Sequence, residues 1–472
     1  MNSSPFRVRG VVEGFYGVYY TWPERTDLIQ FIGRHGYNLY IYAPKDDWHH
    51  RQRWSHPYPV TALRAFAACV AAAQAAGVQF CYALHCSLPP EMSEAQAVTA
   101  IAAKLETLYA CGVRAFSLLF DDLDLGPSVD PHEQSRRAAT LHAAICNDVR
   151  AWLQQRDSDC TLSMCPTDYH GSAPFSVYVH TLGALLDPSI ATFYTGPQIC
   201  APTISAADAA AFAQAVGRAP LLWDNYPVND LDMQSELHLG PIRGRAADLA
   251  QSVSGIVVNP MLQAEASKIP LLTYAAYLND PQRYDPETAW RQAALVVAGE
   301  DSVAALDHLA GYTRSSCLDR GAPAEVAGLV RAVIASWRDD QRVASEAARQ
   351  ALAGYFEQLR EDCYHLKYHL DNLRLRDNLL PWVLALEAQL ALARHAQRVL
   401  ERRAQHQDED RARRELARSM AELGPQPKDV AADALIELVR FVQMLEQPLA
   451  IHPSAPAHVH HSPPALAAPA AI

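Results

Sequence analysis

Residues 115–122 have the sequence AFSLLFDD, an unbroken apolar run that ends on two carboxylates. Similar β-rich runs recur along the chain and centre near residues 11, 40, 80, 163, 193, 222 and 257. Segments of helix-forming composition, such as TALRAFAACVAAAQAAG at 61–77, separate them. Continuous apolar strands joined by helices are typical of a parallel sheet that helices cover. Eight such units within about 250 residues predict a (β/α)8 barrel.

The pattern of the sequence changes after residue 285. Strand patterns stop, and Ala, Leu, Arg and Glu recur at helical spacing up to about residue 449. We therefore predict a barrel domain at 1–285 and an α-helical bundle domain at 286–449. Residues 450–472 are rich in Pro and Ala and predict a disordered tail. A doubly wound open sheet is the alternative for the first domain, but GVVEGFYG at 10–17 is not the glycine-rich phosphate loop of that fold.

Composition argues against several classes of partner. The chain has 472 residues and a formal net charge of −12, which disfavours a nucleic-acid partner or an anionic membrane surface. Its ten cysteines show no CxxC pair, which indicates reduced thiols packed as small hydrophobes. The sequence shows neither a secretory signal nor an apolar run long enough to span a bilayer, which predicts a cytoplasmic protein. It predicts no particular oligomeric state.

The candidate site lies at the ends of the predicted strands, because a (β/α)8 barrel has its active site at the carboxyl ends of its strands. Carboxylates, amides, aromatics and one lysine follow the strands in the segments 13–17, 43–47, 121–122, 165–169, 223–230 and 259–260. This mixture suits a polyhydroxylated, ring-shaped ligand. No cysteine–histidine cluster with the spacing of zinc ligands occurs, and we predict no metal site.

Asp121 and Asp122 form the most specific feature of these strand ends. Burying either charge without a partner is costly, and two adjacent carboxylates do not both ionise easily. One of the two pKa values is therefore expected to rise, which is what a general acid near neutral pH needs. The spacing alone leaves two other interpretations open, a cap for the following helix and a site for a divalent cation.

Further motifs accompany this pair, in a fixed order along the barrel. They are VVEGFYG (11–17), YNLYIYAPKDDWHHR (37–51), FSLLFDDLD (116–124), CPTDYHG (165–171), TGP (195–197), LLWDNYPVND (221–230) and VVNP (257–260). With them the chain closely resembles family 84 of the glycoside hydrolases, which includes the O-GlcNAcases, enzymes that remove N-acetylglucosamine from serine and threonine. The resemblance covers about residues 7–290 and is specific, because YAPKDD, FDD and WDN each fall at a predicted strand end.

The resemblance implies a role for each candidate residue. Asp121 would orient the acetamide of the substrate and hold its N–H, and Asp122 would be the general acid and then the general base. The other implied contacts are with the sugar: Tyr169 and Asn225 at the acetamide and the reacting centre, Trp223 at the acetamide methyl group, and Gly14, Lys45, Asp230 and Asn259 at hydroxyl groups.

Two adjacent carboxylates on one strand end are poorly placed to attack opposite faces of a sugar ring, as an ordinary retaining pair does. The expected mechanism is therefore substrate-assisted: the 2-acetamido oxygen attacks the anomeric carbon and forms an oxazoline, with no metal or organic cofactor. The expected substrate is a glycoprotein or other glycoconjugate that carries GlcNAc. A hexosaminidase for hyaluronan or another polysaccharide, a metal-dependent hydrolase and a non-catalytic sugar-binding barrel are the alternatives.

The chain departs from the family pattern in two segments. Val18–Tyr20 stands where EGFYG is usually followed by Arg-Pro-Trp, and His85–Ser87 replaces the usual Ser-Pro-Gly after the third strand. We expect both segments on the rim, where they would affect the preference for the aglycone and not the chemistry. A third group, Asp46, Asp47, His49 and His50, looks like a set of metal ligands in isolation, but here a structural hydrogen-bond network is expected.

Overall fold

The computed structural model describes residues 4–89, 92–123, 128–313, 316–318, 323–338, 342–423, 428, 430 and 432–445. Within them, parallel strands close into a barrel in the order β1 to β8. The strands are β1 (Val8–Glu13), β2 (Leu39–Tyr42), β3 (Gln79–His85), β4 (Ala115–Leu119), β5 (Thr161–Cys165), β6 (Ala191–Tyr194), β7 (Leu221–Asp224) and β8 (Gly255–Val258). Each lies in one predicted apolar run, so the predicted (β/α)8 barrel is confirmed.

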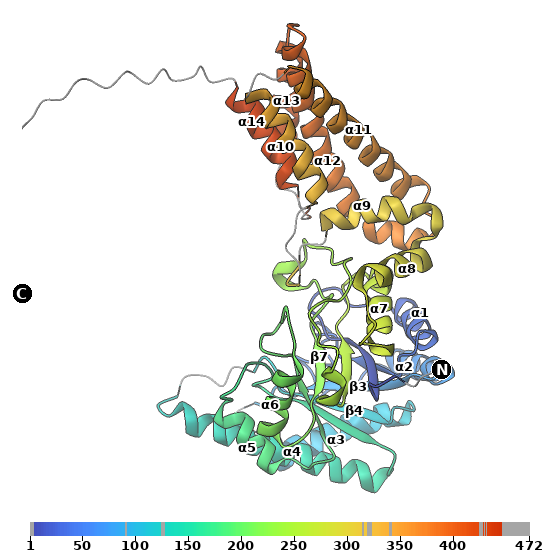
Figure 1. The fold of residues 1–472 in the computed structure, drawn as a ribbon. Coiled ribbons are helices and arrows are strands. Elements are labelled where there is room, and N and C mark those ends of the chain that lie inside the picture. Colours follow the sequence, from blue (N-terminus) through green and yellow to red (C-terminus); the bar gives the residue numbers. More distant parts are fainter. Residues whose placement is uncertain are drawn as a thin grey trace, which may run out of the picture.

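Helices connect the strands and cover the outside of the barrel (Figure 1). They are α1 (Trp22–Arg34), α2 (Val60–Ala75), α3 (Glu94–Ala110), α4 (Pro131–Arg156), α5 (Val177–Leu185), α6 (Ala206–Val216) and α7 (Ala264–Asn279). Local sequence sets where several of them begin. Thr21, Ser93 and Ser205 each start a capping box, in which the cap and the residue three positions later satisfy one another's backbone N–H groups.

The strand register brings the candidate residues to one rim. The barrel interior is a separate apolar cluster of Val12, Ile41, Ala43, Cys81, Ala83, Ala115, Leu119, Cys165, Phe193, Leu221, Trp223 and Val257. Glu13 pairs with Tyr42, and Leu119 pairs with Cys165, so neighbouring parallel strands end at nearly the same level. The polar residues that follow the strands therefore surround the same opening.

The described chain beyond α7 is helical apart from its connecting turns. Its α-helices are α8 (Pro286–Ala298), α9 (Val303–Thr313), α10 (Ala324–Arg338), α11 (Arg342–Tyr368), α12 (Leu373–Ala404), α13 (Asp410–Glu422) and α14 (Asp433–Met444). In Figure 1, α10–α14 form a bundle that extends away from the barrel, with α8 and α9 between the two. None of the described helices combines the length and the apolarity that crossing a membrane requires. All ten cysteines are free. The tail predicted for 450–472 lies outside the described residues.

The helical region, defined as α8–α14, completes the last helix of the barrel. Gln263, which precedes α7, makes no side-chain cap. Instead, Asn378 of α12 accepts the backbone N–H groups of Glu265 and Ala266 through its Oδ1, at 3.1 and 3.2 Å. The N-terminus of α7 is thus capped by a residue 113 positions later in the chain.

Candidate active site

A cavity of about 390 Å³ opens at the carboxyl-end rim of the barrel. The cavity brings together all nine candidate residues: Gly14, Lys45, Asp121, Asp122, Tyr169, Trp223, Asn225, Asp230 and Asn259. Other lining residues have no predicted role, among them Tyr16, Thr195, Cys200 and Leu231. Trp223 lies in β7 and the other candidates follow strands, so the rule that strand ends carry the site finds the segments, and the family resemblance selects the nine residues within them.

Asp121 follows β4, and its side chain is buried. Lys45 Nζ donates to Asp121 Oδ2, and His85 Nε2 donates to the backbone oxygen of Asp121 at 2.8 Å. Burial would raise the pKa of Asp121, but the charge of Lys45 lowers it, and the net pKa is below its usual value. The pKa of Asp121 therefore shifts opposite to the rise that a general acid needs. Among the described residues, Asp121 Oδ1 has no hydrogen-bond partner, which leaves a buried, ionised acceptor available to a donor.

Asp122 has a different environment, although it is the next residue. Its side chain is 33% exposed, and Lys45 Nζ is 4.0 Å from Oδ2. Tyr16 donates its hydroxyl to Oδ2 at 2.6 Å, and Tyr169 donates to Oδ1 at 3.3 Å. Burial and the neighbouring Asp122 raise the pKa of both tyrosines, which keeps them protonated as donors. Asp122 has a φ of 56°, an uncommon left-handed conformation of the kind found at functional sites.

The floor of the cavity is a network of amides around Trp223. Asn225 Oδ1 accepts the indole N–H of Trp223 at 2.9 Å and an N–H of Asn259 at 3.0 Å, while its Nδ2 donates to the backbone oxygen of Ile199. Asn225 therefore has one N–H left for a ligand. A Cβ on Gly14 would lie 2.2 Å from Trp223, so glycine is required for this packing. The N–H of Gly14 donates to Asn259, and only its carbonyl oxygen remains for a sugar hydroxyl.

Asp230 forms part of the wall on the β7 side. Its Oδ2 accepts the backbone N–H of Tyr16 at 2.8 Å, and burial raises its pKa. The short 3-10 helix η1 (Leu231–Met233) follows, and all three of its residues line the cavity. Leu231 is also left-handed, with a φ of 49°, and its side chain is 58% exposed.

His85 corrects one expectation from the sequence. It was expected on the rim, but it is the last residue of β3 and only 1% exposed. A carbonyl oxygen can only accept, so the contact with Asp121 fixes the proton on Nε2, and Ser87 Oγ lies 3.3 Å from Nδ1. Burial lowers the pKa of His85 to about 4, which makes the ring neutral near pH 7. Within the other departing segment, Val18 is 84% exposed, as expected for the rim, but Tyr20 is only 3% exposed, because its hydroxyl donates to the backbone oxygen of Met261 inside the fold.

The acidic and histidine residues after β2 form the expected structural network. Asp47 accepts the hydroxyl groups of Tyr42 and Tyr58, at 2.7 and 2.6 Å, and the backbone N–H of His49. His50 contacts the backbone oxygen of Ala83 through Nδ1 at 2.9 Å. Among the residues that the structure describes, no three His, Cys, Asp or Glu side chains converge on a site for a metal ion.

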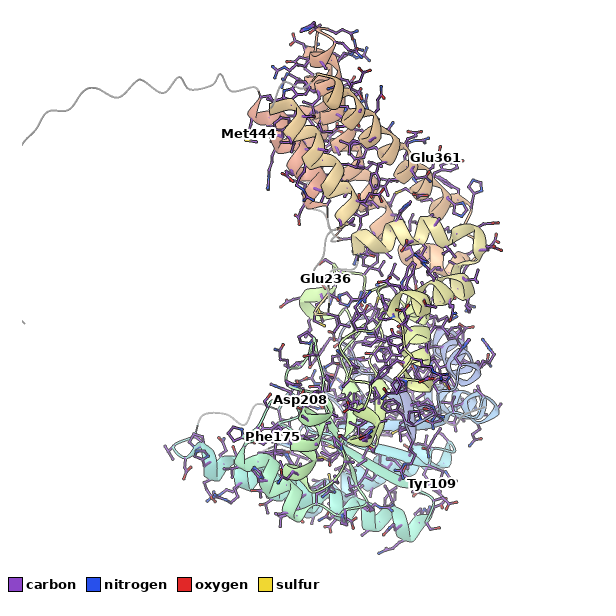
Figure 2. All side chains as sticks on the ribbon, in the orientation of Figure 1. Tyr109, Phe175, Asp208, Glu236, Glu361 and Met444 are labelled. Atoms are coloured by element: carbon purple, nitrogen blue, oxygen red, sulfur yellow. The ribbon has the colours of Figure 1, made fainter. Side chains whose placement is uncertain are left out.

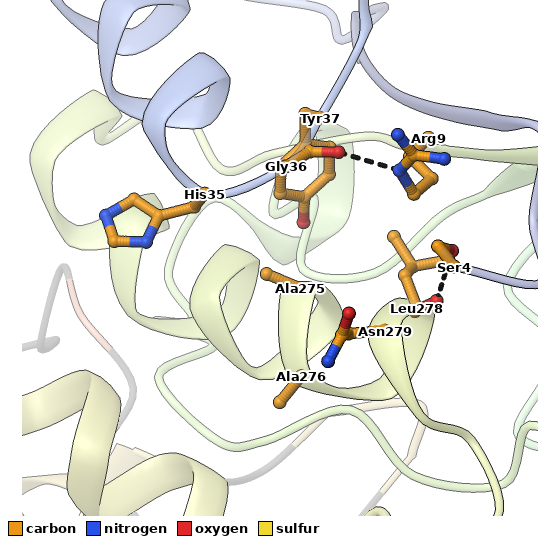
Figure 3. Close-up of a pocket in the computed structure, with 9 residues that line it drawn as sticks. All are labelled: Ser4, Arg9, His35, Gly36, Tyr37, Ala275, Ala276, Leu278 and Asn279. Atoms are coloured by element: carbon orange, nitrogen blue, oxygen red, sulfur yellow. Dashed lines mark hydrogen bonds between the residues drawn. The ribbon is translucent and has the colours of Figure 1, made fainter. Parts of the chain in front are cut away.

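A second cavity, of about 420 Å³, lies at the amino end of the barrel, between β1, the α1–β2 turn and α7 (Figure 3). Its polar groups bond to neighbouring backbone. Arg9 donates to the carbonyl oxygens of Phe6 and Gly36, and Ser4 donates to that of Leu278. Its lining includes no carboxylate, so it lacks the acidic pair that glycoside hydrolysis uses.

Comparison with known families gives a match over most of the barrel and beyond. The family model described as beta-N-acetylglucosaminidase matches residues 9–311. Two mammalian proteins named Protein O-GlcNAcase, from Rattus norvegicus and Mus musculus, are 33% and 32% identical over 273 residues. That alignment covers 57% of this chain but only 29% of the mammalian proteins. This chain therefore spans less than a third of the length of these curated relatives.

A solved structure is similar over nearly the whole chain. It is that of an O-GlcNAc hydrolase of Thermobaculum terrenum, in the form of an aspartate-to-asparagine mutant. The two chains are 28% identical, and the superposition has a TM-score of 0.85 over 94% of this chain and 95% of that chain. The likeness therefore extends through the helical region as well as the barrel.

Proposed function

The chain belongs to the beta-N-acetylglucosaminidase family, family 84 of the glycoside hydrolases, and on that basis we propose that it hydrolyses β-linked N-acetylglucosamine from the end of a glycoconjugate. One observation supports this proposal most directly. Asp121 is a buried carboxylate that Lys45 keeps ionised, and its Oδ1 has no partner among the described residues. An acetamide N–H is a donor that would satisfy this oxygen.

The first chemical step forms an oxazoline. The acetamide oxygen of the substrate attacks the anomeric carbon, and the C–O bond to the aglycone breaks. Asp121 accepts the acetamide N–H and stabilises the positive charge that develops on the acetamide nitrogen, an electrostatic role that a preorganised buried carboxylate performs well. Asp122 protonates the departing oxygen, and the hydroxyl groups of Tyr16 and Tyr169 fix the direction of its carboxylate.

The second step reverses these roles. Asp122 removes a proton from the incoming water, which attacks the anomeric carbon and opens the oxazoline. Two successive attacks at one carbon retain the β configuration. The amides of the floor and the ring of Trp223 shape the space for the acetamide, while Lys45, Asp230 and Asn259 are the proposed partners of sugar hydroxyl groups. All these roles use the chain's own residues, and we propose no cofactor.

We propose a protein that carries O-linked GlcNAc as the substrate, because relatives of this chain are named for that activity. A polysaccharide such as hyaluronan is the second candidate. A glycopeptide with one O-GlcNAc and a hyaluronan oligosaccharide of similar mass, compared at equal concentration, separate the two. A kcat/KM at least tenfold higher for the oligosaccharide would replace our proposal with the alternative.

The test of the activity itself compares two aryl glycosides, the β-N-acetylglucosaminide and the β-glucoside, which differ only at the 2-position. We expect turnover of the first alone, because only the first carries the acetamide nucleophile. Equal turnover of both would refute substrate assistance. Turnover of neither would favour a non-catalytic sugar-binding barrel. Loss of turnover in EDTA, restored by a divalent cation, would favour a metal-dependent hydrolase.

A further inference from the structure

The loop between β7 and β8 lies between the cavity and the helical region and contacts both. On one side, Asp230 and η1 form a wall of the cavity. On the other side, the next residues of the loop reach the helical region. Glu236, labelled in Figure 2, lies where the barrel meets that region. If the contacts between the helical region and this loop changed, the shape of the cavity wall would therefore change as well.

Trp382 of α12 makes the central contact with the loop. Its indole is 1% exposed, and its Nε1 donates to the backbone oxygen of Ser235 at 2.8 Å. Lys428 Nζ donates to the backbone oxygen of Gln234 at 2.6 Å and lies 4.5 Å from the centre of the Trp382 ring. Two consecutive carbonyl groups of the loop thus bond to side chains of the helical region.

The conformation of the loop is one that needs such restraint. Leu231 has a left-handed backbone, which a leucine seldom adopts and which persists when the surrounding structure imposes it. The strained residue lies between two anchors. Tyr16 N–H holds the side chain of Asp230 on the barrel side, and Trp382 holds Ser235 on the helical side.

We propose that Trp382 is a positioning residue for the active site: by bonding to Ser235 it holds residues 230–235 in the conformation that places Asp230 and Leu231 against the bound substrate. Trp382 does not itself line the cavity. The consequence for binding rests on the proposed function, whereas the restraint on the loop does not. The helical region would then tune affinity without supplying a catalytic group.

Two variants and one control test the restraint on the loop. Trp382→Phe removes the indole N–H and keeps an aromatic ring, and Lys428→Met removes the second contact at a partly exposed position. Trp337→Phe is the control, because Trp337 is a partly buried tryptophan of the helical region near Arg349 of α11 and, within the described chain, has no hydrogen bond or ring contact with the loop. In hydrogen exchange, we expect the amides of Met233 and Glu236, which bond within the loop, to exchange faster in Trp382→Phe than in the wild type or the control. Unchanged exchange in Trp382→Phe would overturn the proposal, and faster exchange in Lys428→Met alone would assign the restraint to Lys428 instead.

Kinetics test the consequence for the substrate. Trp382→Phe should raise KM for the aryl β-N-acetylglucosaminide by about threefold to tenfold, the range for one lost hydrogen bond, with kcat changed less than about twofold. In the background of Asp230→Asn the same change should raise KM much less, because its effect acts through Asp230. A loss of thermal stability with an unchanged KM would make Trp382 purely structural. A wild type without turnover would overturn the proposed function, and hydrogen exchange would still decide whether Trp382 restrains the loop.

Discussion

The barrel has a cavity at each end, and the two cavities are of similar volume, about 390 and 420 Å³. At the amino end, Arg9 and Ser4 bond to backbone oxygens. At the carboxyl end, Asp121 Oδ1 lacks a partner among the described residues, and Asp122 and Leu231 have left-handed backbones. Size therefore does not separate a functional cavity from a structural gap. The carboxyl-end cavity differs from the amino-end cavity because it combines an unsatisfied buried acceptor with two strained residues, and both features cost stability.

The largest expected loss of activity comes from substitution of Asp122, at the carboxyl end of the barrel. We expect Asp122→Ala to slow hydrolysis of alkyl glycosides by on the order of 10²–10⁴-fold, because a poor leaving group needs a general acid. Formation of the intermediate from activated aryl glycosides should be largely spared. Added azide needs no general base, so it should capture the intermediate and give the β-azide. Rates measured over a series of leaving groups check this, and a uniform loss over the series would contradict it.

The next effect separates Asp121 from its neighbour. Asp121→Asn should slow every substrate by about 10²–10³-fold, whatever the leaving group, because the lost charge acts on the acetamide. Azide should restore little activity. Progressive fluorination of the N-acetyl methyl group should also slow the wild type steeply, since it weakens the attacking oxygen. Identical dependence on the leaving group in the two aspartate variants would rule out the proposed division of roles.

Smaller losses are expected from the proposed sugar contacts. Lys45→Ala and Asp230→Asn should each cost about 1.5–3 kcal/mol of transition-state binding, measured as kcat/KM. Lys45→Ala has a second consequence: burial raises the pKa of Asp121 and Lys45 opposes it, so removing Lys45 should raise that pKa. The acid limb of the kcat/KM profile should therefore move to higher pH. A collapse of thermal stability with normal activity per folded molecule would show that these residues are structural.

The smallest effect is expected at the amino end. His35 lines that cavity and packs on Phe31, with ring centres 4.6 Å apart. His35→Ala should change the free energy of unfolding by less than about 0.5–1 kcal/mol and leave kcat/KM unchanged, because this cavity lies at the opposite end of the barrel from the two aspartates and has no carboxylate in its lining. A tenfold loss of kcat/KM in a variant that folds normally would show that the cavity at the amino end also contributes to activity.

The sequence predicts the barrel and the nine site residues because both depend on local order along the chain. An apolar run fixes a strand, and a parallel barrel then places every strand end at one rim. Contacts that depend on the conformation of loops cannot be predicted in this way. Two such contacts join segments that are distant in sequence: the hydrogen bond from Tyr16 to Asp122 and the hydrogen bond from Trp382 to Ser235. The family pattern likewise gave no sign that His85 lies beneath Asp121, because a substitution in a motif does not show which way its side chain turns.

The domain boundaries at 285 and 449, the cytoplasmic location and the individual residue roles stay predictions. The boundary at 285 has a physical complication. Asn378 caps α7, and Asn372 donates to Glu265 at 2.9 Å, so the last helix of the barrel and the start of α12 share hydrogen bonds. A barrel truncated at residue 285 would lose both contacts.

The cap from Asn378 also has a consequence for biosynthesis. A ribosome releases α7 before α12, and Asn378 follows Glu265 by 113 residues. At a synthesis rate of about 5–20 residues per second, roughly 6–23 seconds pass between the synthesis of Glu265 and that of Asn378, whose side chain caps the first turn of α7. During that interval the nascent barrel has all eight strands, but its closing helix has an unsatisfied N-terminus. The N-terminal cap of the barrel's last helix therefore comes from a segment that is synthesised after the barrel itself.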